Sequence, residues 1–349
     1  MSQKNVGILT FHDADNLGAV LQAFALQTTL DKKCGVAAEV IDYKCDKILS
    51  TKRVKKPKSV KDFIKYPLMS VYYWIKRRGF SRFRKEYLKS SPQSYDLNNI
   101  KNCELPYDMI ISGSDQVFNT ECSGDDYTYF LDFAKAKKIS YAASIGKHKF
   151  NDAECEKIVP IIKDFKAVSV REESAKAELE RIGITDVQVH PDPVVLLKNE
   201  EWQKYKTKRL LKKPYVLVYL VLPDDNVLNC AKQYAKKHGL KVICNKKSAK
   251  FIFHNSPREF LSWVYNAECV FTNSFHGTAF SLIFNKPLAA DIKLLSGGIN
   301  NRINDFLNKT NTLQCVLDKD NINPVKPNAQ KSLNNLRELG INFLKTQCE

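Results

Sequence analysis

The stretch CVFTNSFHGTAFSLIFNKPLAADI, residues 269–292, holds the pattern that decides the fold. Residues 269–272 predict a short buried strand, residues 275–285 predict a helix, and residues 288–292 predict a second strand. A strand, a helix and a further strand in this order form a βαβ unit with parallel strands. The stretch therefore predicts an α/β fold built on parallel sheets.

The same alternation continues on both sides of this stretch. Further strands are expected at residues 6–11, 37–43, 108–112, 139–144, 167–170, 187–190, 215–222 and 241–244, with helices at 19–30, 171–181, 226–238, 256–266 and 329–345. A chain of 349 residues favours two domains. The turn HPDP at 190–193 suggests a domain at 1–191, a second at 192–325 and a final helix at 326–349.

Two Rossmann-like domains of this kind imply a cleft between them, with ligands bound at the carboxyl ends of the strands. Neither a G-x-G-x-x-G fingerprint nor a Walker A loop is present, so ordinary nucleotide binding lacks support in the sequence.

Composition excludes several classes of protein. The start, MSQKNVGILTFHD, becomes polar too early for a signal peptide, and the run YVLVYLVL at 215–222 is too short to span a bilayer. Ten cysteines stand singly, without C-x-x-C pairs or zinc spacing, which indicates reduced thiols and no metal site. We therefore expect a cytoplasmic protein.

The net charge of +17 is concentrated in one segment. Residues 51–89 carry fourteen Lys and Arg against Asp62 and Glu86, interleaved with eight aromatic residues. One interpretation is a solvated helical face with an aromatic stripe on the core. Another is a patch that lies on an anionic membrane surface. Nucleic acid is disfavoured as a partner, because the sequence lacks RNP, helix-turn-helix and zinc-finger signatures.

Three predicted strand-to-helix turns carry small polar residues where backbone amides would meet an anion. Their candidates for substrate binding are Asn16, Ser112, Gly113, Asn273 and Ser274. Each has a structural alternative, because such residues also cap helices or permit tight turns.

Charged and titratable residues near these turns are further candidates. His276 is expected in the first turn of a helix, beside Gly277, where it is suited to acid–base chemistry. Arg171 follows a strand; a salt bridge to Glu172 or Glu173 is the alternative, but we favour ligand binding because those neighbours should point elsewhere. Further candidates are Ser144, His148, Asp115, Lys286 and Arg302, with solvated charge the favoured interpretation for Lys286.

Six motifs together resemble the polysaccharide pyruvyl transferases. They are N-x-G-A-x-L-Q-A-x-A-L from residue 16, I-I-S-G-S-D-Q-V-F-N from 110, Y-A-A-S-I-G from 141, V-S-V-R-E-x-S from 168, D-P-V from 192 and T-N-S-F-H-G from 272. The similarity runs from about residue 6 to residue 307 in the expected order.

This resemblance implies a glycosyltransferase-B-like fold and the transfer of a pyruvyl group from phosphoenolpyruvate to a sugar of a bacterial surface glycan, as a cyclic ketal on two hydroxyls. It also implies that Arg171 and His276 belong to the donor site. Many members carry Arg where this chain has Ser274, so the missing charge is expected from Lys286 or Arg302.

A mechanism follows from these expectations. Arg171 and the polar turns hold the phosphate and carboxylate of the donor, and His276 protonates its methylene carbon or stabilises the departing phosphate. Asp115 and His148 are candidates for the base. The scheme requires neither a metal nor a cofactor, since phosphoenolpyruvate is a co-substrate.

Two rival functions remain open. One is a glycosyltransferase of the same fold that uses a nucleotide sugar, and the other is a non-catalytic scaffold that binds anionic lipid through residues 51–89. Membrane binding is also compatible with the enzyme, which would then act peripherally at the inner face of the plasma membrane. Its acceptor would be a capsular polysaccharide or exopolysaccharide precursor on a polyprenyl diphosphate carrier.

Overall fold

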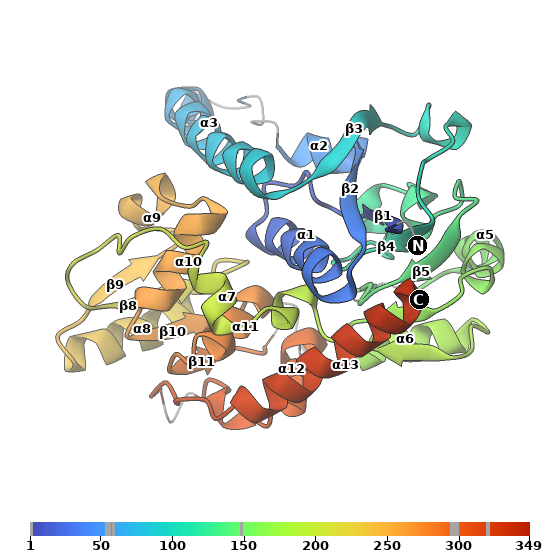
Figure 1. Cartoon of the computed structure of the whole chain (residues 1–349). Helices are drawn as coiled ribbons and strands as arrows, with labels where there is room; N and C mark the ends of the chain where they lie inside the picture. Colours follow the sequence, from blue (N-terminus) through green and yellow to red (C-terminus); the bar gives the residue numbers. More distant parts are fainter. Residues whose placement is uncertain (1–2, 53–56, 58–59, 147–148, 294–299, 319–321) are drawn as a thin grey trace. The chain divides into compact units, whose positions relative to one another are not determined.

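The computed structural model describes residues 3–52, 57, 60–146, 149–293, 300–318 and 322–349 (Figure 1). The chain forms two compact units, Met1–Leu196 with Leu336–Glu349, and Leu197–Asn335. Each is an α/β unit with a parallel sheet, which confirms the predicted fold class. The division lies after Leu196 rather than after residue 191, and most of the final helix belongs to the first unit.

The first unit is organised around a five-stranded parallel sheet with the strand order β3-β2-β1-β4-β5. Its strands are β1 (Asn5–Leu9), β2 (Ala37–Tyr43), β3 (Ser90–Tyr95), β4 (Met109–Ser112) and β5 (Lys137–Ser140). Single bridges connect β5 and its continuation to a parallel pair, β6 (Val168–Val170) and β7 (Val187–Val189). The strands therefore follow each other as in a Rossmann fold, and their carboxyl ends form one edge.

Helix α1 (Leu17–Thr29) is the central helix of this unit. Its sequence, LGAVLQAFALQTT, is apolar nearly all round, and all thirteen residues are buried, as expected for a helix enclosed by protein. A short π-helical turn, Leu30–Cys34, continues it, and Gly35 ends the turn at a φ of 71°, a conformation that favours glycine.

The other helices of the first unit are α2 (Asp46–Thr51), α3 (Val60–Tyr87), α4 (Thr120–Ser123), α5 (Asp152–Lys163) and α6 (Glu173–Arg181). The long helix α3 is formed by the basic and aromatic segment of the sequence. It runs along the outside of the unit in Figure 1. Helix α5 begins with a capping box in which Asn151 and Glu154 satisfy each other's backbone N–H groups.

The second unit contains a four-stranded parallel sheet with the order β11-β10-β8-β9. The strands are β8 (Tyr215–Tyr219), β9 (Lys241–Cys244), β10 (Cys269–Thr272) and β11 (Leu288–Ala290). Its helices are α7 (Asn199–Gln203), α8 (Asp225–Lys237), α9 (Ala249–Phe253), α10 (Pro257–Asn266), α11 (Phe275–Ile283) and α12 (Asn301–Lys309). Every strand leads into a helix, so the loops that follow the strands lie at the carboxyl edge of this sheet as well.

The C-terminal helix α13 (Gln330–Cys348) packs on the first unit through its second half. The ring of Phe343 lies 4.3 Å from that of His190 and 6.0 Å from that of Tyr141. The Lys4 ammonium donates a hydrogen bond of 2.8 Å to the Cys348 carbonyl. This hydrogen bond connects the residue before β1 to the C-terminal end of α13.

All ten cysteines lie within the described residues, and none of them forms a disulfide. Among the described residues, no helix combines the length and apolarity needed to cross a membrane.

Candidate functional site

Arg171 stands at the carboxyl edge of the first unit, directly after β6, and is held by two carboxylates. Its Nη1 lies 2.7 Å from Asp192 Oδ2 and its Nε lies 3.3 Å from Glu172 Oε2. These side chains are 3%, 0% and 1% exposed, respectively. The expectation that Glu172 would point away was therefore wrong, because Glu172 is the N-cap of α6 and has extended backbone, which turns its side chain back toward the sheet edge.

The carboxylates of Glu172 and Asp192 determine the direction in which the pKa of Arg171 shifts. Burial alone would lower the pKa of the Arg171 guanidinium, but the negative charges of Glu172 and Asp192 outweigh burial and raise that pKa. Ser114 Oγ lies 3.3 Å from the same Asp192 oxygen. One guanidinium thus faces two buried carboxylates, so its charge is compensated within the protein. Donor contact by Arg171 stays a prediction.

The other polar candidates of this edge contact protein atoms. Asn16 accepts hydrogen bonds from the backbone of Gly18 at 2.9 Å and caps α1. Ser112 Oγ donates to the Tyr129 carbonyl at 2.7 Å, and Ser144 Oγ donates to Glu172 at 2.5 Å. Both serines are fully buried. These contacts match the structural alternatives, and substrate binding by the three residues stays a prediction.

Gly113 and Asp115 shape the loop that follows β4. A Cβ at Gly113 would lie 3.1 Å from Thr10 Cβ, so the glycine allows a tight approach to β1. Asp115 has a φ of 79°, in the left-handed region that L residues rarely adopt, and is half-buried. Its carboxylate also contributes to raising the pKa of Arg171. His148, the other candidate base, lies outside the described residues.

At the carboxyl edge of the second unit, the connection from β10 to α11 brings three predicted residues together. Ser274 caps α11 by accepting a hydrogen bond from the Gly277 amide at 3.3 Å. Asn273 Oδ1 accepts from the Val221 amide at 2.9 Å, which ties the loop after β8 to this turn. His276 is the second residue of α11 and is half-buried, between the buried residues Phe275 and Gly277.

Gly277 allows close packing between α11 and the sheet. A Cβ there would lie 2.4 Å from Thr272 Oγ1 and 3.1 Å from Tyr219 Cδ1. Thr272 Oγ1 cannot easily move, because it donates to the Tyr219 carbonyl at 2.5 Å and accepts from the Ser274 amide at 3.0 Å. The glycine therefore lets α11 approach the strands closely.

Two carboxylates at this edge were not predicted as site residues. Asp291 follows β11, and its amide donates to the Thr272 carbonyl at 2.7 Å. Asp224 caps α8. Burial of Asp291 raises the pKa of its carboxyl group, and the nearby charge of Asp224 raises it further. A carboxyl group held against ionisation in this way is typical of functional sites. Sequence reasoning missed Asp291 because no motif marks it and because it falls within the predicted strand 288–292, whereas β11 ends at Ala290.

The two remaining cations lie at opposite edges of this sheet. Arg302 is in the first turn of α12, and Asn300, the cap of that helix, donates to the Ile292 carbonyl at 2.7 Å next to Asp291. Arg302 thus follows the carboxyl edge, and its contact with substrate stays a prediction. Lys286 lies at the amino edge, 5.4 Å from the Tyr265 ring, because α11 returns the chain there before β11 begins. The prediction that Lys286 flanks the site was wrong.

The family model of the polysaccharide pyruvyl transferases matches residues 16–290, most of both units. The chain belongs to this family. It is therefore a transferase that moves pyruvyl groups onto polysaccharide. A search of curated proteins finds no match.

Solved structures resemble this pyruvyl transferase only distantly. A UDP-GlcNAc 2-epimerase from Methanocaldococcus jannaschii is 14% identical, with 97% of this chain and 99% of that chain covered and a TM-score of 0.47. The corresponding enzyme from Neisseria meningitidis is 11% identical, with coverage of 100% and 94% and a TM-score of 0.48. The E. coli heptosyltransferase WaaC is 11% identical, with coverage of 85% and 91% and a TM-score of 0.36. Likenesses this distant say nothing of what the transferase binds.

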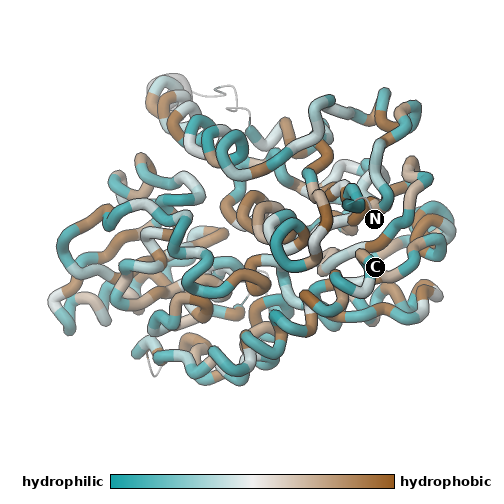
Figure 2. The backbone as a smooth tube through the Cα atoms, viewed as in Figure 1, coloured by the Kyte–Doolittle hydropathy of each residue, from teal (hydrophilic) through white to brown (hydrophobic). Residues whose placement is uncertain are grey.

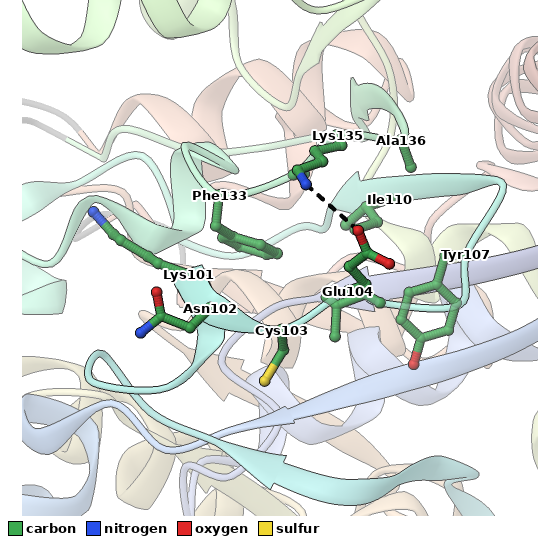
Figure 3. A pocket seen from close by; sticks show the side chains of 11 residues that line it. Lys101, Asn102, Cys103, Glu104, Tyr107, Ile110, Phe133, Lys135 and Ala136 are labelled. Atoms are coloured by element: carbon green, nitrogen blue, oxygen red, sulfur yellow. Dashed lines mark ion pairs between the residues drawn. The ribbon is translucent and has the colours of Figure 1, made fainter.

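One pocket of the transferase lies away from these edges. It measures about 590 Å³ and is lined by residues 101–105, 107, 110 and 133–136, with Glu104 and Lys135 facing each other at 3.6 Å (Figure 3). Its lining immediately precedes β4 and β5, so it opens at the amino edge of the first sheet. Within the described ranges, no group of three or more His, Cys, Asp or Glu side chains is placed to hold a metal ion.

Proposed function

We propose that this enzyme transfers the pyruvyl group of phosphoenolpyruvate to two hydroxyls of one sugar in a capsular polysaccharide or exopolysaccharide precursor. The products are a cyclic ketal and phosphate. The observation that carries the proposal is the position of His276, half-buried in the first turn of α11 at the carboxyl edge of the second sheet, in a chain of the pyruvyl transferase family.

The chemistry of the donor fits this edge. Phosphoenolpyruvate carries a phosphate and a carboxylate, and the first turn of a helix offers unpaired backbone N–H groups with a partial positive charge. Arg302 follows the same edge and supplies a cation that can bind either group. In this proposal, Arg302 of α12 supplies the charge that many family members carry at position 274.

Residues of this edge can supply the proton transfers that the reaction requires. Protonated His276 gives a proton to the methylene carbon of the donor, and an acceptor hydroxyl forms a C–O bond to the adjacent carbon. Asp291 takes the proton of that hydroxyl. The second hydroxyl then bonds to the same carbon, the bond to phosphate breaks, and its proton leaves with the phosphate. A carboxyl group whose pKa is raised by burial and by Asp224 is suited to this role of base.

A direct assay tests the proposal. The enzyme is incubated with phosphoenolpyruvate and the methyl glycosides of glucose, galactose and mannose, and phosphate release is followed together with the mass of each glycoside. We expect phosphate release coupled to a mass gain of one pyruvate less one water on at least one glycoside. UDP-glucose serves as the competing donor in thermal-shift measurements. A shift with UDP-glucose and none with phosphoenolpyruvate would overturn the proposal in favour of a nucleotide-sugar glycosyltransferase.

A further inference from the structure

Helix α3 exposes an uncharged, largely apolar segment to solvent. Residues 66–75 read YPLMSVYYWI and contain no charged side chain. Large apolar side chains here are widely accessible, with 65% of Leu68, 59% of Trp74 and 49% of Val71 exposed. In Figure 2, α3 carries both hydrophobic and hydrophilic residues along its length. Exposed large apolar residues this closely spaced mark an interaction surface rather than ordinary surface composition.

The other end of the same helix is fixed to the first unit. Phe80 and Phe83 are buried, and the Phe83 ring lies 5.6 Å from that of Phe24 in α1. Arg84 Nη2 lies 3.2 Å from Asp15, in the loop before α1. Among the described aromatic side chains of the basic segment, Phe80 and Phe83 pack on the core, whereas Tyr66 and Trp74 are exposed. The sequence suggested either a helical face packed on the core or a patch on a membrane surface. Neither interpretation alone accounts for both the buried and the exposed side chains.

Cations gather where the apolar segment ends. Six basic residues stand between residues 76 and 85 without an acidic one. Arg84 pairs with Asp15, and the other five are Lys76, Arg77, Arg78, Arg82 and Lys85. Arg77, Arg78, Arg82 and Lys85 are exposed, and the Arg78 guanidinium lies 5.3 Å from the centre of the Trp74 ring. The apolar residues 66–75 and these cations together form what we name the α3 docking surface (residues 66–85).

Exposed apolar residues beside a group of cations favour a lipid surface over a protein partner. The apolar segment is too short to cross a bilayer, since spanning takes about 20 residues. A helix segment that is apolar and exposed, with Trp, Tyr and basic residues beside it, matches the headgroup boundary, where aromatic rings and cationic side chains are preferred. Anionic headgroups complement the five cations.

We propose that the α3 docking surface binds the surface of an anionic lipid bilayer and holds the enzyme at the membrane. Apolar side chains such as Leu68 and Trp74 enter the boundary between headgroups and acyl chains, and Arg77, Arg78 and Arg82 contact lipid phosphates. Together with the proposed function, on which this part rests, such binding places the enzyme beside an acceptor carried on a polyprenyl diphosphate.

Vesicle sedimentation with the full chain tests the docking itself, without donor or acceptor. The probes are vesicles of phosphatidylcholine alone and vesicles with one third phosphatidylglycerol. We expect binding to the anionic vesicles that weakens with added salt. The double variant Leu68→Glu, Trp74→Glu should bind about tenfold more weakly or worse, because two large apolar contacts are lost. The triple variant Arg77→Glu, Arg78→Glu, Arg82→Glu should also lose binding.

Matched controls separate this surface from general hydrophobicity and charge. Leu97→Glu with Leu339→Glu changes two other exposed leucines, and Lys208→Glu with Lys212→Glu and Lys213→Glu reverses three other exposed cations. Both controls should bind vesicles as the unchanged chain does. Equal binding by the Leu68, Trp74 variant would overturn the proposal. Self-association in solution that this variant abolishes, without vesicle binding by the unchanged chain, would assign the surface to a second copy instead. Failure of the pyruvyl transfer assay on soluble glycosides would count against the proposed function and not against docking.

Discussion

The Arg171 guanidinium meets the Asp192 carboxylate at 2.7 Å, with both side chains almost fully buried. These residues are 21 positions apart and lie on the two sides of β7 in the chain, so their ion pair joins the loops that follow β6 and β7. Because Glu172 contacts the same guanidinium, removal of the cation leaves two buried carboxylates without their partner.

Replacement of Arg171 by Ala should therefore destabilise the first unit. Loss of one partner from a buried ion pair typically costs about 3–5 kcal/mol. Thermal unfolding should show a clear fall in Tm, and Arg171→Ala combined with Asp192→Ala should cost less than the sum of the single changes. An unchanged Tm together with a raised KM for phosphoenolpyruvate would instead assign Arg171 to donor binding.

Replacement of His276 by Ala should abolish most of the turnover and leave the fold intact. A positioned acid or base contributes about 10²–10⁴-fold to a rate, so kcat for phosphate release should fall by that range. The half-buried side chain makes a large loss of Tm unexpected. Replacement of His238 by Ala, at the C-terminal end of α8, is the matched control. Turnover that survives in His276→Ala would remove this residue from the mechanism.

Asp291 predicts a particular dependence of stability on pH. Because burial and Asp224 raise the pKa of its carboxyl group in the folded protein, the fold prefers the protonated form. Its contribution to stability is complete below the ordinary carboxyl pKa and is lost as pH rises through the raised value. Asp291→Asn should therefore unfold at a higher Tm than the unchanged chain near pH 8, and the difference should vanish toward about pH 4.

The matched control for this prediction is Asp225→Asn. Its hydrogen bond to Lys247 lowers the pKa of Asp225, so this exposed carboxylate should show the opposite sign. If Asp291 is the base, Asp291→Asn should also lose turnover while gaining stability at high pH. If the Tm of Asp291→Asn varied with pH as the Tm of the unchanged chain does, the raised pKa of Asp291 would be contradicted.

Replacement of Gly277 by Ala should destabilise the second unit. The new Cβ would lie 2.4 Å from Thr272 Oγ1, which is held by two hydrogen bonds. Overpacking of this kind costs about 1–3 kcal/mol. In a Thr272→Ala background the same change should cost less, because the blocking hydroxyl is absent. A fall in Tm that is equal in both backgrounds would contradict this explanation.

Much of the fold could be predicted because strands and helices alternate with clear periodicity. Strands β2, β9 and β10 occupy the expected residues. Strand β3 could not be found in this way, since its sequence SSPQSY is polar and contains proline, which an edge strand tolerates. Helix α5 could have been predicted, because Asn151 and Glu154 stand at the spacing of a capping box.

The site was less accessible to sequence reasoning. The His276 turn could be placed because it directly follows an unmistakable strand. The error at Lys286 was avoidable, since a residue between a helix and the next parallel strand must lie at the amino edge. The partner of Arg171 was not predictable from spacing, because contact between residues 171 and 192 depends on how β6 and β7 pair. Likewise, only the folded chain shows that burial and Asp224 act together on Asp291.

Helix α13 has a consequence for synthesis of the protein. Residues 336–349 belong to the first unit and contact Lys4, Tyr141 and His190 through Cys348 and Phe343. A ribosome delivers these residues only after the whole second unit has been translated. The first unit is thus completed only after the second, and until translation reaches α13 the rings of Tyr141 and His190 lack their contact with Phe343.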